Sequence, residues 1–479
     1  MLFNSLAFLL FFPAVCVLYY CIPSSLIRAR NLLLLVASYY FYMNWEPSYA
    51  LLLLTSTVVT YIAALAIVHV HGRSTKRLCL ACSLFINIVI LFFFKYYTFL
   101  SSSITSALQS AGIAIDLPQF GLLLPVGISF YTFQAMGYSI DVFRNEKIVE
   151  RDFFTYALFV SFFPQLVAGP IERSSNLLPQ FRKSSRFDYD QAMSGLRLMV
   201  WGYFLKLVMA DRCGIYVDAI FNNTSMHNGG SFLVASLLFT FQIYGDFAGY
   251  SLIAIGVARI MGFRLMQNFR YPYLATSVGD FWHRWHISLS TWFKDYVYIP
   301  LGGNRVSRCR HYRNLMLTFT LSGIWHGANW TFFCWGFVHG IMLCIEKTLG
   351  ISGRRYNERW TKLAHCVVTF ILINMTWILF RSNNLSEAAY IITAIFTNPG
   401  MPFIGARNAG VGCLIASSAA IAIVMAKDIA SERMQYTSSS SVNRLCKKPM
   451  VQYLYIAFMM AVITLFGVLD GDQFIYFQF

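Results

Sequence analysis

The 479 residues are 57% hydrophobic and only 12% charged, with a mean hydropathy of +0.56 and a formal net charge of +16. An average soluble domain carries about a quarter charged residues, so this composition excludes an ordinary water-soluble enzyme. The positive residues fall in short links between apolar runs, which argues against nucleic acid as a partner and for orientation in a membrane. The sequence therefore predicts an all-α polytopic integral membrane protein.

Apolar runs of membrane-crossing length recur along the chain. The runs at 3–22, 49–70 and 451–469 are each about the 20 residues that a helix needs to cross a hydrocarbon core of roughly 30 Å. Besides a short helix at 387–397, further spans are expected at 78–94, 121–143, 192–209, 231–260, 362–380 and 410–425. We expect about eleven spans, with the stretch 101–119, whose only charge is Asp116, outside the membrane.

The charged links indicate an orientation. The link at 44–47 carries only Glu46, whereas the links on either side of it carry Arg28 and Arg30 and then His71, Arg73, Lys76 and Arg77. Because Lys and Arg collect on the cytoplasmic side, the N-terminus is expected outside and the basic links in the cytoplasm. The first run lacks a basic leader and a clear cleavage site, so we interpret it as the first membrane helix.

The segment 153–180 breaks the alternation of spans. Pro164, Gly169 and Pro170 disfavour a continuous helix, and the residues that follow are again basic: Arg182, Lys183 and Arg186. Backbone that enters and leaves on one side is tolerated where protein or a water-filled cavity surrounds it. We therefore expect a re-entrant element here.

Ionisable residues inside the spans predict helix faces turned inward. Arg197 and Lys206 lie in the run 192–209, and Asp246 lies near the middle of 231–260. A buried carboxylate is either a structural hydrogen-bond partner or part of a polar path. We favour the structural role for Asp246, because it can be satisfied locally by Gln242, Tyr244 and Tyr250.

The residues that can carry chemistry concentrate between Gly279 and Gly340. In FWHRWHIS, His283 and His286 are three apart, so on a helix they would share roughly one face. A metal site would need a third ligand, and although His326 could supply one, no carboxylate stands at a ligand spacing, so we predict no metal. The alternative is that these are packed or snorkelling histidines among tryptophans.

The second histidine segment, SGIWHGANW, has a different character. Gly323 and Gly327 flank His326 and allow backbone or ligand to approach closely, while Trp325 and Trp330 can line an apolar tunnel. About half a membrane depth of helix separates the segment from a basic run, Arg305, Arg308, Arg310 and Arg313. This pattern suggests a cytoplasmic landing place for a polyanion leading to a buried imidazole that can take a proton from a hydroxyl.

These segments resemble the membrane-bound O-acyltransferase family. The resemblance is to its bacterial branch, which serves alginate O-acetylation, peptidoglycan O-acetylation and teichoic acid D-alanylation. It spans nearly the whole chain and is carried by LPVGISFYTFQAMGYSIDVFR, FFPQLVAGPIERSSNLLPQF, GDFWHRWHISLSTWFKDYVYIPLGGNR and LSGIWHGANW.

The resemblance implies residue roles. The near-invariant histidine of the family corresponds to His326, expected as general base, and the second family histidine to His286, expected to orient or polarise the carbonyl. His283 lies outside the pattern and is given no role. Substrate or donor contacts are expected from Trp325, Gly327, Trp330, Asp295, Asn304 and Arg305, although for Asp295 and Asn304 packing or capping is an equal alternative.

The resemblance also implies an activity and an architecture. It implies an O-acetyltransferase of the bacterial inner membrane that moves acetyl from a cytoplasmic thioester such as acetyl-CoA to an extracytoplasmic polysaccharide or a partner acetyltransferase, with no permanently bound cofactor. A ring of helices and re-entrant pieces would enclose a funnel meeting near His326. The whole chain is expected to form one membrane domain, with N-terminal helices over 1–119, a catalytic core over 120–400 and C-terminal helices over 401–479.

Three alternatives stay open from the residues alone. D-alanyl transfer from a carrier-protein thioester would use the same histidines. A transporter with a histidine relay would show two related halves with paired interrupted helices, which the sequence does not display. Direct transfer is favoured over an acyl-enzyme, because no serine or cysteine has a matching base and orienting acid.

Overall fold

The computed structural model describes residues 1–121, 124–167, 169–354, 356, 358–405, 409–436 and 448–469. Every regular element within these ranges is a helix, which confirms the all-α prediction. The sequence also predicts a cytoplasmic loop at 437–441 with Arg444 and Lys447, and it predicts that Asp470 and Asp472 lie outside the membrane; these residues are not among those described.

The chain divides into two compact units. Unit 1 comprises residues 1–196 and 254–266, and unit 2 comprises residues 197–253 and 267–479. Two long helices belong partly to each unit, α10 (Tyr189–Tyr203) and α12 (Gly229–Ile260). These units do not follow the segments expected from the sequence, and the single-domain organisation stays a prediction.

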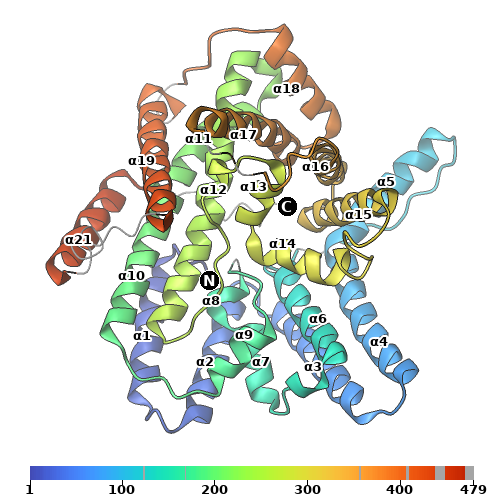
Figure 1. Cartoon of the computed structure of the whole chain (residues 1–479), viewed down its shortest axis with the longest axis vertical. Helices are drawn as coiled ribbons and strands as arrows, with labels where there is room; N and C mark the ends of the chain where they lie inside the picture. The colour runs from blue at the N-terminus through green and yellow to red at the C-terminus, as the bar shows by residue number, and fades with distance from the viewer. Residues whose placement is uncertain are drawn as a thin grey trace. The chain divides into compact units, whose positions relative to one another are not determined.

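Unit 1 holds the N-terminal helices. They are α1 (Leu6–Cys21), α2 (Ile27–Met43), α3 (Tyr49–His69), α4 (Arg73–Leu91), the π-helical η1 (Phe92–Tyr96), α5 (Tyr97–Ser110), α6 (Ile128–Arg144), η2 (Glu146–Ile148), α7 (Phe153–Ser161), α8 (Phe163–Leu166) and α9 (Ser174–Phe181). Helix α3 packs on α4 and α6, and α2 packs on α7 (Figure 1).

Two boundaries in unit 1 differ from the sequence prediction. The run expected to end near residue 94 continues through η1 and α5 as 38 helical residues, Arg73–Ser110, so the first half of the predicted external stretch is helical. Residues 97–108 mix apolar side chains with serines and threonines, a composition that suits a helix leaving the membrane. The span predicted from residue 121 begins as a helix only at Ile128, after Gly127 in the left-handed region.

The segment predicted to be re-entrant is interrupted where its sequence indicated. It forms α7, α8 and α9, of nine, four and eight residues, and none is long enough to cross a bilayer. Buried hydrogen bonds satisfy its backbone: Gln134 and Gln165 both donate to the carbonyl oxygen of Phe159, at 2.6 and 2.8 Å. These side chains satisfy the Phe159 carbonyl at the end of α7, where the Phe163 N–H donates to the Ser38 hydroxyl at 3.0 Å instead of continuing the helix.

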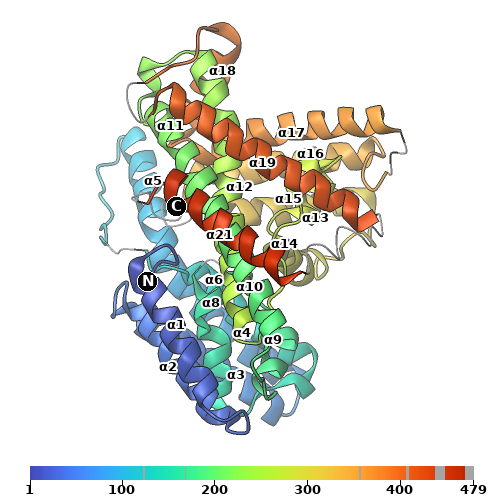
Figure 2. The same ribbon diagram turned by 90° about the vertical axis from the view of Figure 1, so that its left-hand side faces the viewer.

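Unit 2 contains the histidine stretch. Its helices are η3 (Phe204–Ala210), α11 (Asp211–Phe221), η4 (Thr224–Met226), η5 (Pro272–Leu274), α13 (Val278–Arg284), α14 (Ile287–Phe293), η6 (Lys294–Tyr298), α15 (Arg308–His326), α16 (Trp330–Thr348), α17 (Arg359–Arg381), α18 (Leu385–Thr397), α19 (Val411–Tyr436) and α21 (Pro449–Phe466). Helices α15, α16 and α17 lie side by side, and α13 packs on α16 (Figure 2).

An ionic triad lies inside unit 2. The Lys206 ammonium, on the π-helical η3, is 2.8 Å from Asp211 and 2.7 Å from Asp246, and the lysine side chain is 1% exposed. Asp246 is thus paired with a cation on η3, which was not expected from the sequence, and its structural role stays a prediction. The sequence predicts that Lys206 faces inward, but it does not indicate that Lys206 pairs with Asp211 and Asp246.

Seven helices among the described residues are long and apolar enough to cross a membrane. They include α3, α12 and α17, and the run Arg73–Ser110, all at predicted positions. Helix α1, with 16 residues, is apolar but shorter than this criterion. The chain is a multi-pass membrane protein, while the total of about eleven spans and their arrangement around a funnel stay predictions.

Candidate functional site

His286 lies at a sharp break between two short helices. Helix α13 ends at Arg284, Trp285 is extended, and His286 adopts φ 43° and ψ 54°, the left-handed region that few residues other than glycine occupy. This corrects the expectation that His283 and His286 share one helical face, because the backbone turns between them. His283 is exposed, whereas His286 is completely buried.

The His286 ring is held by Asn268. Its Nδ1 lies 3.0 Å from Asn268 Oδ1, which also accepts hydrogen bonds from the Ser288 hydroxyl at 2.9 Å and the Ser288 backbone N–H at 3.3 Å. The backbone donor identifies this Asn268 atom as the oxygen, so Nδ1 of His286 must be the donor. Nε2 of the neutral ring therefore carries the lone pair. Burial lowers the pKa of His286 to about 3, so the ring is neutral near pH 7.

His326 is the last residue of α15 and is 2% exposed. Its ring centroid lies 6.4 Å from that of His286 and 5.0 Å from that of Trp325. Trp335 of α16 and Phe380 of α17 contact it from other sides, at 5.1 and 5.5 Å. The structure thus brings the two predicted histidines together from separate helices in an aromatic environment.

Glycines set the position of His326. A Cβ at Gly323 would lie 2.3 Å from the carbonyl oxygen of Phe332 and 2.9 Å from Cα of Gly336, so α15 and α16 meet backbone to backbone. A Cβ at Gly327 would lie 2.1 Å from the Phe332 ring. The close approach predicted at Gly323 and Gly327 is therefore to the chain itself, and Gly327 makes room for packing.

The other predicted contact residues divide into two groups. Trp325 is buried, and its ring lies 6.0 Å from that of His286, so it belongs to the site. Trp330 is 50% exposed at the start of α16, and Asp295 is half-buried on η6. Asn304 and Arg305 are exposed in the link before α15. The substrate or donor contacts expected from these four residues stay predictions.

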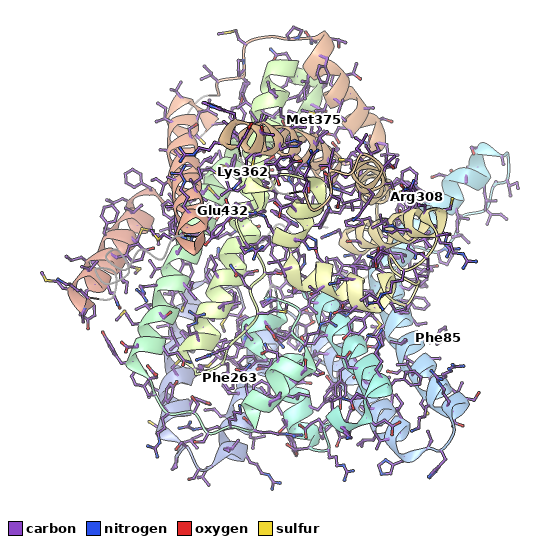
Figure 3. All side chains as sticks on the ribbon, viewed as in Figure 1. Phe85, Phe263, Arg308, Lys362, Met375 and Glu432 are labelled. Atoms are coloured by element: carbon purple, nitrogen blue, oxygen red, sulfur yellow. The ribbon has the colours of Figure 1, made fainter. Side chains whose placement is uncertain are left out.

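Carboxylates fix α13, which leads into His286. Glu346, buried on α16, accepts the backbone N–H groups of Val278 at 2.5 Å and Gly279 at 3.0 Å, which are unsatisfied donors of the first turn of α13. At the other end, Arg284 pairs with Asp280 at 2.9 Å and with Glu432 of α19 at 3.0 Å (Figure 3 marks Glu432). These pairs hold both ends of a seven-residue helix that has little stability of its own.

Sequence reasoning missed three residues of this arrangement: Asn268, Glu346 and His339. His339 is fully buried on α16, 4.8 Å from Trp335 between ring centroids. Glu346 and His339 are polar residues within an apolar helix, which was the available signal. Asn268 carried none, because its role depends on a contact across 18 residues of irregular chain.

Among the described residues, no group of three or more His, Cys, Asp or Glu side chains is placed to hold a metal ion. The chemistry these residues offer on their own is proton transfer and hydrogen bonding. Two buried imidazoles among aromatic rings suit the deprotonation of a hydroxyl as it attacks a carbonyl carbon.

The sequence is similar to that of known proteins. The family model for membrane-bound O-acyltransferases matches residues 141–386, which include both histidine segments. The probable alginate O-acetylase of Pseudomonas syringae pv. tomato is 41% identical over 400 residues, 83% of this chain and 75% of that protein. The peptidoglycan O-acetyltransferase of Helicobacter pylori is 36% identical over a region that covers 82% of this chain and 79% of that protein. The teichoic acid D-alanyltransferase of Streptococcus thermophilus is 28% identical over a region that covers 54% of this chain and 68% of that protein.

Proposed function

Because the chain belongs to the membrane-bound O-acyltransferase family, we propose that it transfers an acetyl group from a cytoplasmic thioester to the hydroxyl of an extracytoplasmic polysaccharide, directly or through a partner transferase. The chain is an acyltransferase of the membrane. The acetyl group, the acetyl-CoA donor, the polysaccharide acceptor and the bacterial inner membrane are parts of the proposal.

The relatives support acetyl over D-alanyl transfer. The two O-acetylating relatives are 41% and 36% identical over more than four fifths of this chain. The D-alanyltransferase relative is 28% identical over 54% of it. D-alanyl transfer from a carrier protein remains the second candidate, because its chemistry needs the same base.

The observation that carries the proposal is the buried pair of imidazoles, His286 and His326, with ring centroids 6.4 Å apart. We assign His326 as the general base on the acceptor hydroxyl, since an imidazole can exchange a proton near neutral pH. Trp325, Trp335 and Phe380 surround it and keep bulk water from competing as acceptor.

His286 takes a different role from the one expected from the sequence. Polarising a carbonyl requires a donor, but the Nδ1–H of His286 is directed to Asn268 and Nε2 carries a lone pair. We therefore assign His286 Nε2 as a hydrogen-bond acceptor that orients the attacking hydroxyl. Asn268 and Ser288 keep it in this tautomer.

Arginines support a phosphate-bearing donor. Arg305, Arg308, Arg310 and Arg313 are all exposed, and they surround the N-terminal end of α15, where the helix dipole adds positive charge (Figure 3 marks Arg308). Helix α15 has 19 residues, from Arg308 to His326. We propose that these arginines attract the phosphates of coenzyme A at the cytoplasmic mouth.

The test is to replace His326 with alanine. In a strain whose own gene is deleted, we expect His326→Ala to leave less than about 1% of the alkali-labile acetate on envelope polysaccharide, because general bases contribute about 10²- to 10⁴-fold. Membrane content of the protein is measured by immunoblot in parallel.

His283→Ala is the matched control, since His283 is an exposed histidine of the same stretch and should leave acetate unchanged. Unchanged acetate in His326→Ala would contradict the assigned base. Loss of ester-linked D-alanine with no change in acetate would instead establish the second candidate.

A further inference from the structure

Four buried nitrogen atoms in unit 2 belong to one aromatic cluster. They are Nε1 of Trp285, Trp335 and Trp377 and Nε2 of His339, which we call the donor cluster. Trp285, Trp335 and His339 are 0% exposed and Trp377 is 1% exposed. Among the described residues, none of these four atoms has a hydrogen-bond partner.

The rings of the cluster are in contact with one another and with His326. The ring centroids of Trp285 and Trp377 are 5.1 Å apart, those of Trp377 and Trp335 are 5.7 Å apart, and those of Trp335 and His339 are 4.8 Å apart. His326 lies 5.1 Å from Trp335. His326 and His339 therefore contact the same indole.

His339 Nε2 is a donor because the neutral ring carries its proton on that nitrogen. The indole N–H of Trp282 donates to Nδ1 of His339 at 3.3 Å. An indole nitrogen can only donate, so Nδ1 carries a lone pair and the proton of the neutral ring is on Nε2. All four atoms of the cluster are consequently N–H donors.

Ordinary packing does not account for such a cluster. More than about 90% of buried polar groups have a partner, and a buried donor without one costs about 1–3 kcal/mol. A single such indole in a core would need no explanation. Four such donors on rings that contact one another, one of which contacts the proposed base, favour a ligand that offers oxygen acceptors and few donors, as an acyl carbonyl does.

We propose that the donor cluster binds the carbonyl oxygen of the acyl thioester, with His339 Nε2–H as the donor that stabilises the oxyanion. This inference rests on the proposed function. It supplies the donor that His286, with its Nδ1–H directed to Asn268, does not. A donor aimed at developing negative charge in a dry site is among the largest contributions to acyl-transfer rates.

The proposed acetyl transfer from the thioester to the hydroxyl takes place in two stages. The hydroxyl oxygen bonds to the carbonyl carbon as His326 takes the hydroxyl proton, and the π-electron pair moves to the carbonyl oxygen, which the His339 N–H stabilises. The carbonyl then re-forms, the carbon–sulfur bond breaks, and the leaving thiolate takes the proton from His326. The ester and the free thiol are the products.

The first test separates kcat from KM in purified protein in lipid nanodiscs, with acetyl-CoA as donor. His339→Leu should lower kcat about 100- to 1,000-fold while changing KM for acetyl-CoA less than about threefold, as expected for an oxyanion donor. His339→Gln, which can accept from Trp282 and still donate, should recover at least tenfold of this loss. Exposed His283→Leu should match the wild type.

The second test does not need turnover. A ketone analogue, acetonyl-CoA, labelled with ¹³C at the carbonyl is bound to each variant, and the carbonyl stretch is recorded by infrared difference spectroscopy. We expect a shift to lower frequency in the wild type and in His326→Ala that is reduced by at least half in His339→Leu. A properly inserted His339→Leu protein with an unchanged carbonyl shift, or with unchanged kcat, would overturn the inference.

These outcomes distinguish the two proposals. If the wild type transfers no acetyl from acetyl-CoA, the proposed function fails whatever His339 does. If the wild type and His326→Ala transfer acetyl equally, the assignment of His326 as the base fails. If only His326→Ala is inactive and His339→Leu retains full kcat, the proposed function stands and the inference fails.

Discussion

At the scale of single residues, His286 shows how the chain determines a protonation state. Its left-handed backbone turns the ring out of the helix line and into the protein, where Asn268 accepts its Nδ1–H at 3.0 Å. Burial lowers the pKa of the ring to about 3. The ring is therefore a neutral acceptor near pH 7.

This lowered pKa predicts an acid sensitivity. Between pH 6.5 and about 3 the unfolded state binds a proton at His286 that the folded state does not, so stability is full above pH 6.5 and falls as the pH drops below it. We expect the midpoint of thermal unfolding in nanodiscs to fall from pH 6.5 to pH 4. His286→Gln, which does not titrate, should show a smaller fall; an identical fall in the variant would refute the assignment.

At the scale of elements, the α15–α16 hairpin positions the base. The two helices meet at Gly323 and Gly336, with no room for a side chain between their backbones. A helix pair that approaches this closely gains dispersion contacts along its length and has one axial register. The position of His326 relative to Trp335 and His339 follows from that register.

Gly323→Ala should therefore separate the hairpin. Its Cβ would lie 2.3 Å from the Phe332 carbonyl oxygen, an atom that cannot move without α16. We expect acetyl transfer to fall at least tenfold, since a displacement of about 1 Å at a reacting centre can cost about a hundredfold. Gly412→Ala, on α19 with open space around it, is the control and should be unaffected. Equal activities would show that the hairpin tolerates the shift.

The triad of Lys206, Asp211 and Asp246 holds η3 against α12. Removing the cation would leave two carboxylates buried side by side, which typically destabilises by about 3–5 kcal/mol. Lys206→Met should accordingly lower the yield of folded protein and the unfolding midpoint. The triple variant with Asp211→Asn and Asp246→Asn should regain most of the stability, and failure to regain it would show that Lys206 acts through packing rather than charge.

At the scale of the whole molecule, the arginines around the start of α15 should govern capture of the donor. Arg308→Gln with Arg310→Gln should raise KM for acetyl-CoA about three- to tenfold at low ionic strength and leave kcat unchanged, because exposed charges act by long-range attraction. The difference should shrink near 0.5 M salt. Arg28→Gln, an exposed arginine in the first basic link, is the control for net charge. A KM effect that persists at high salt would indicate direct packing contacts.

Much of this organisation could be predicted, because the features that a membrane requires of a chain depend on short stretches of sequence. The spans, the break at Pro164 and Gly169, the inward face at Lys206 and the two histidine segments all follow from composition within a few residues. The contacts that define the site do not. The Asn268–His286 bond, the Glu346 cap on α13 and the Trp282–His339 bond join residues 18 to 68 positions apart, and their pairing depends on how helices pack. The π-helical segments η1, η3 and η6 could not be predicted from the sequence either. A π-helix differs from an α-helix in its i→i+5 hydrogen bonds, and the hydrophobic pattern of the sequence does not indicate this difference.

The long helical run Arg73–Ser110 has a consequence for whatever meets this protein outside the membrane. At 1.5 Å per residue its 38 residues extend about 57 Å, well beyond a hydrocarbon core of roughly 30 Å even with a strong tilt. If the N-terminus lies outside, as the sequence predicts, α5 would extend as a helix beyond the outer side of the membrane. A partner enzyme that docks there would recognise a preformed shape, and neither side would lose chain entropy in forming it.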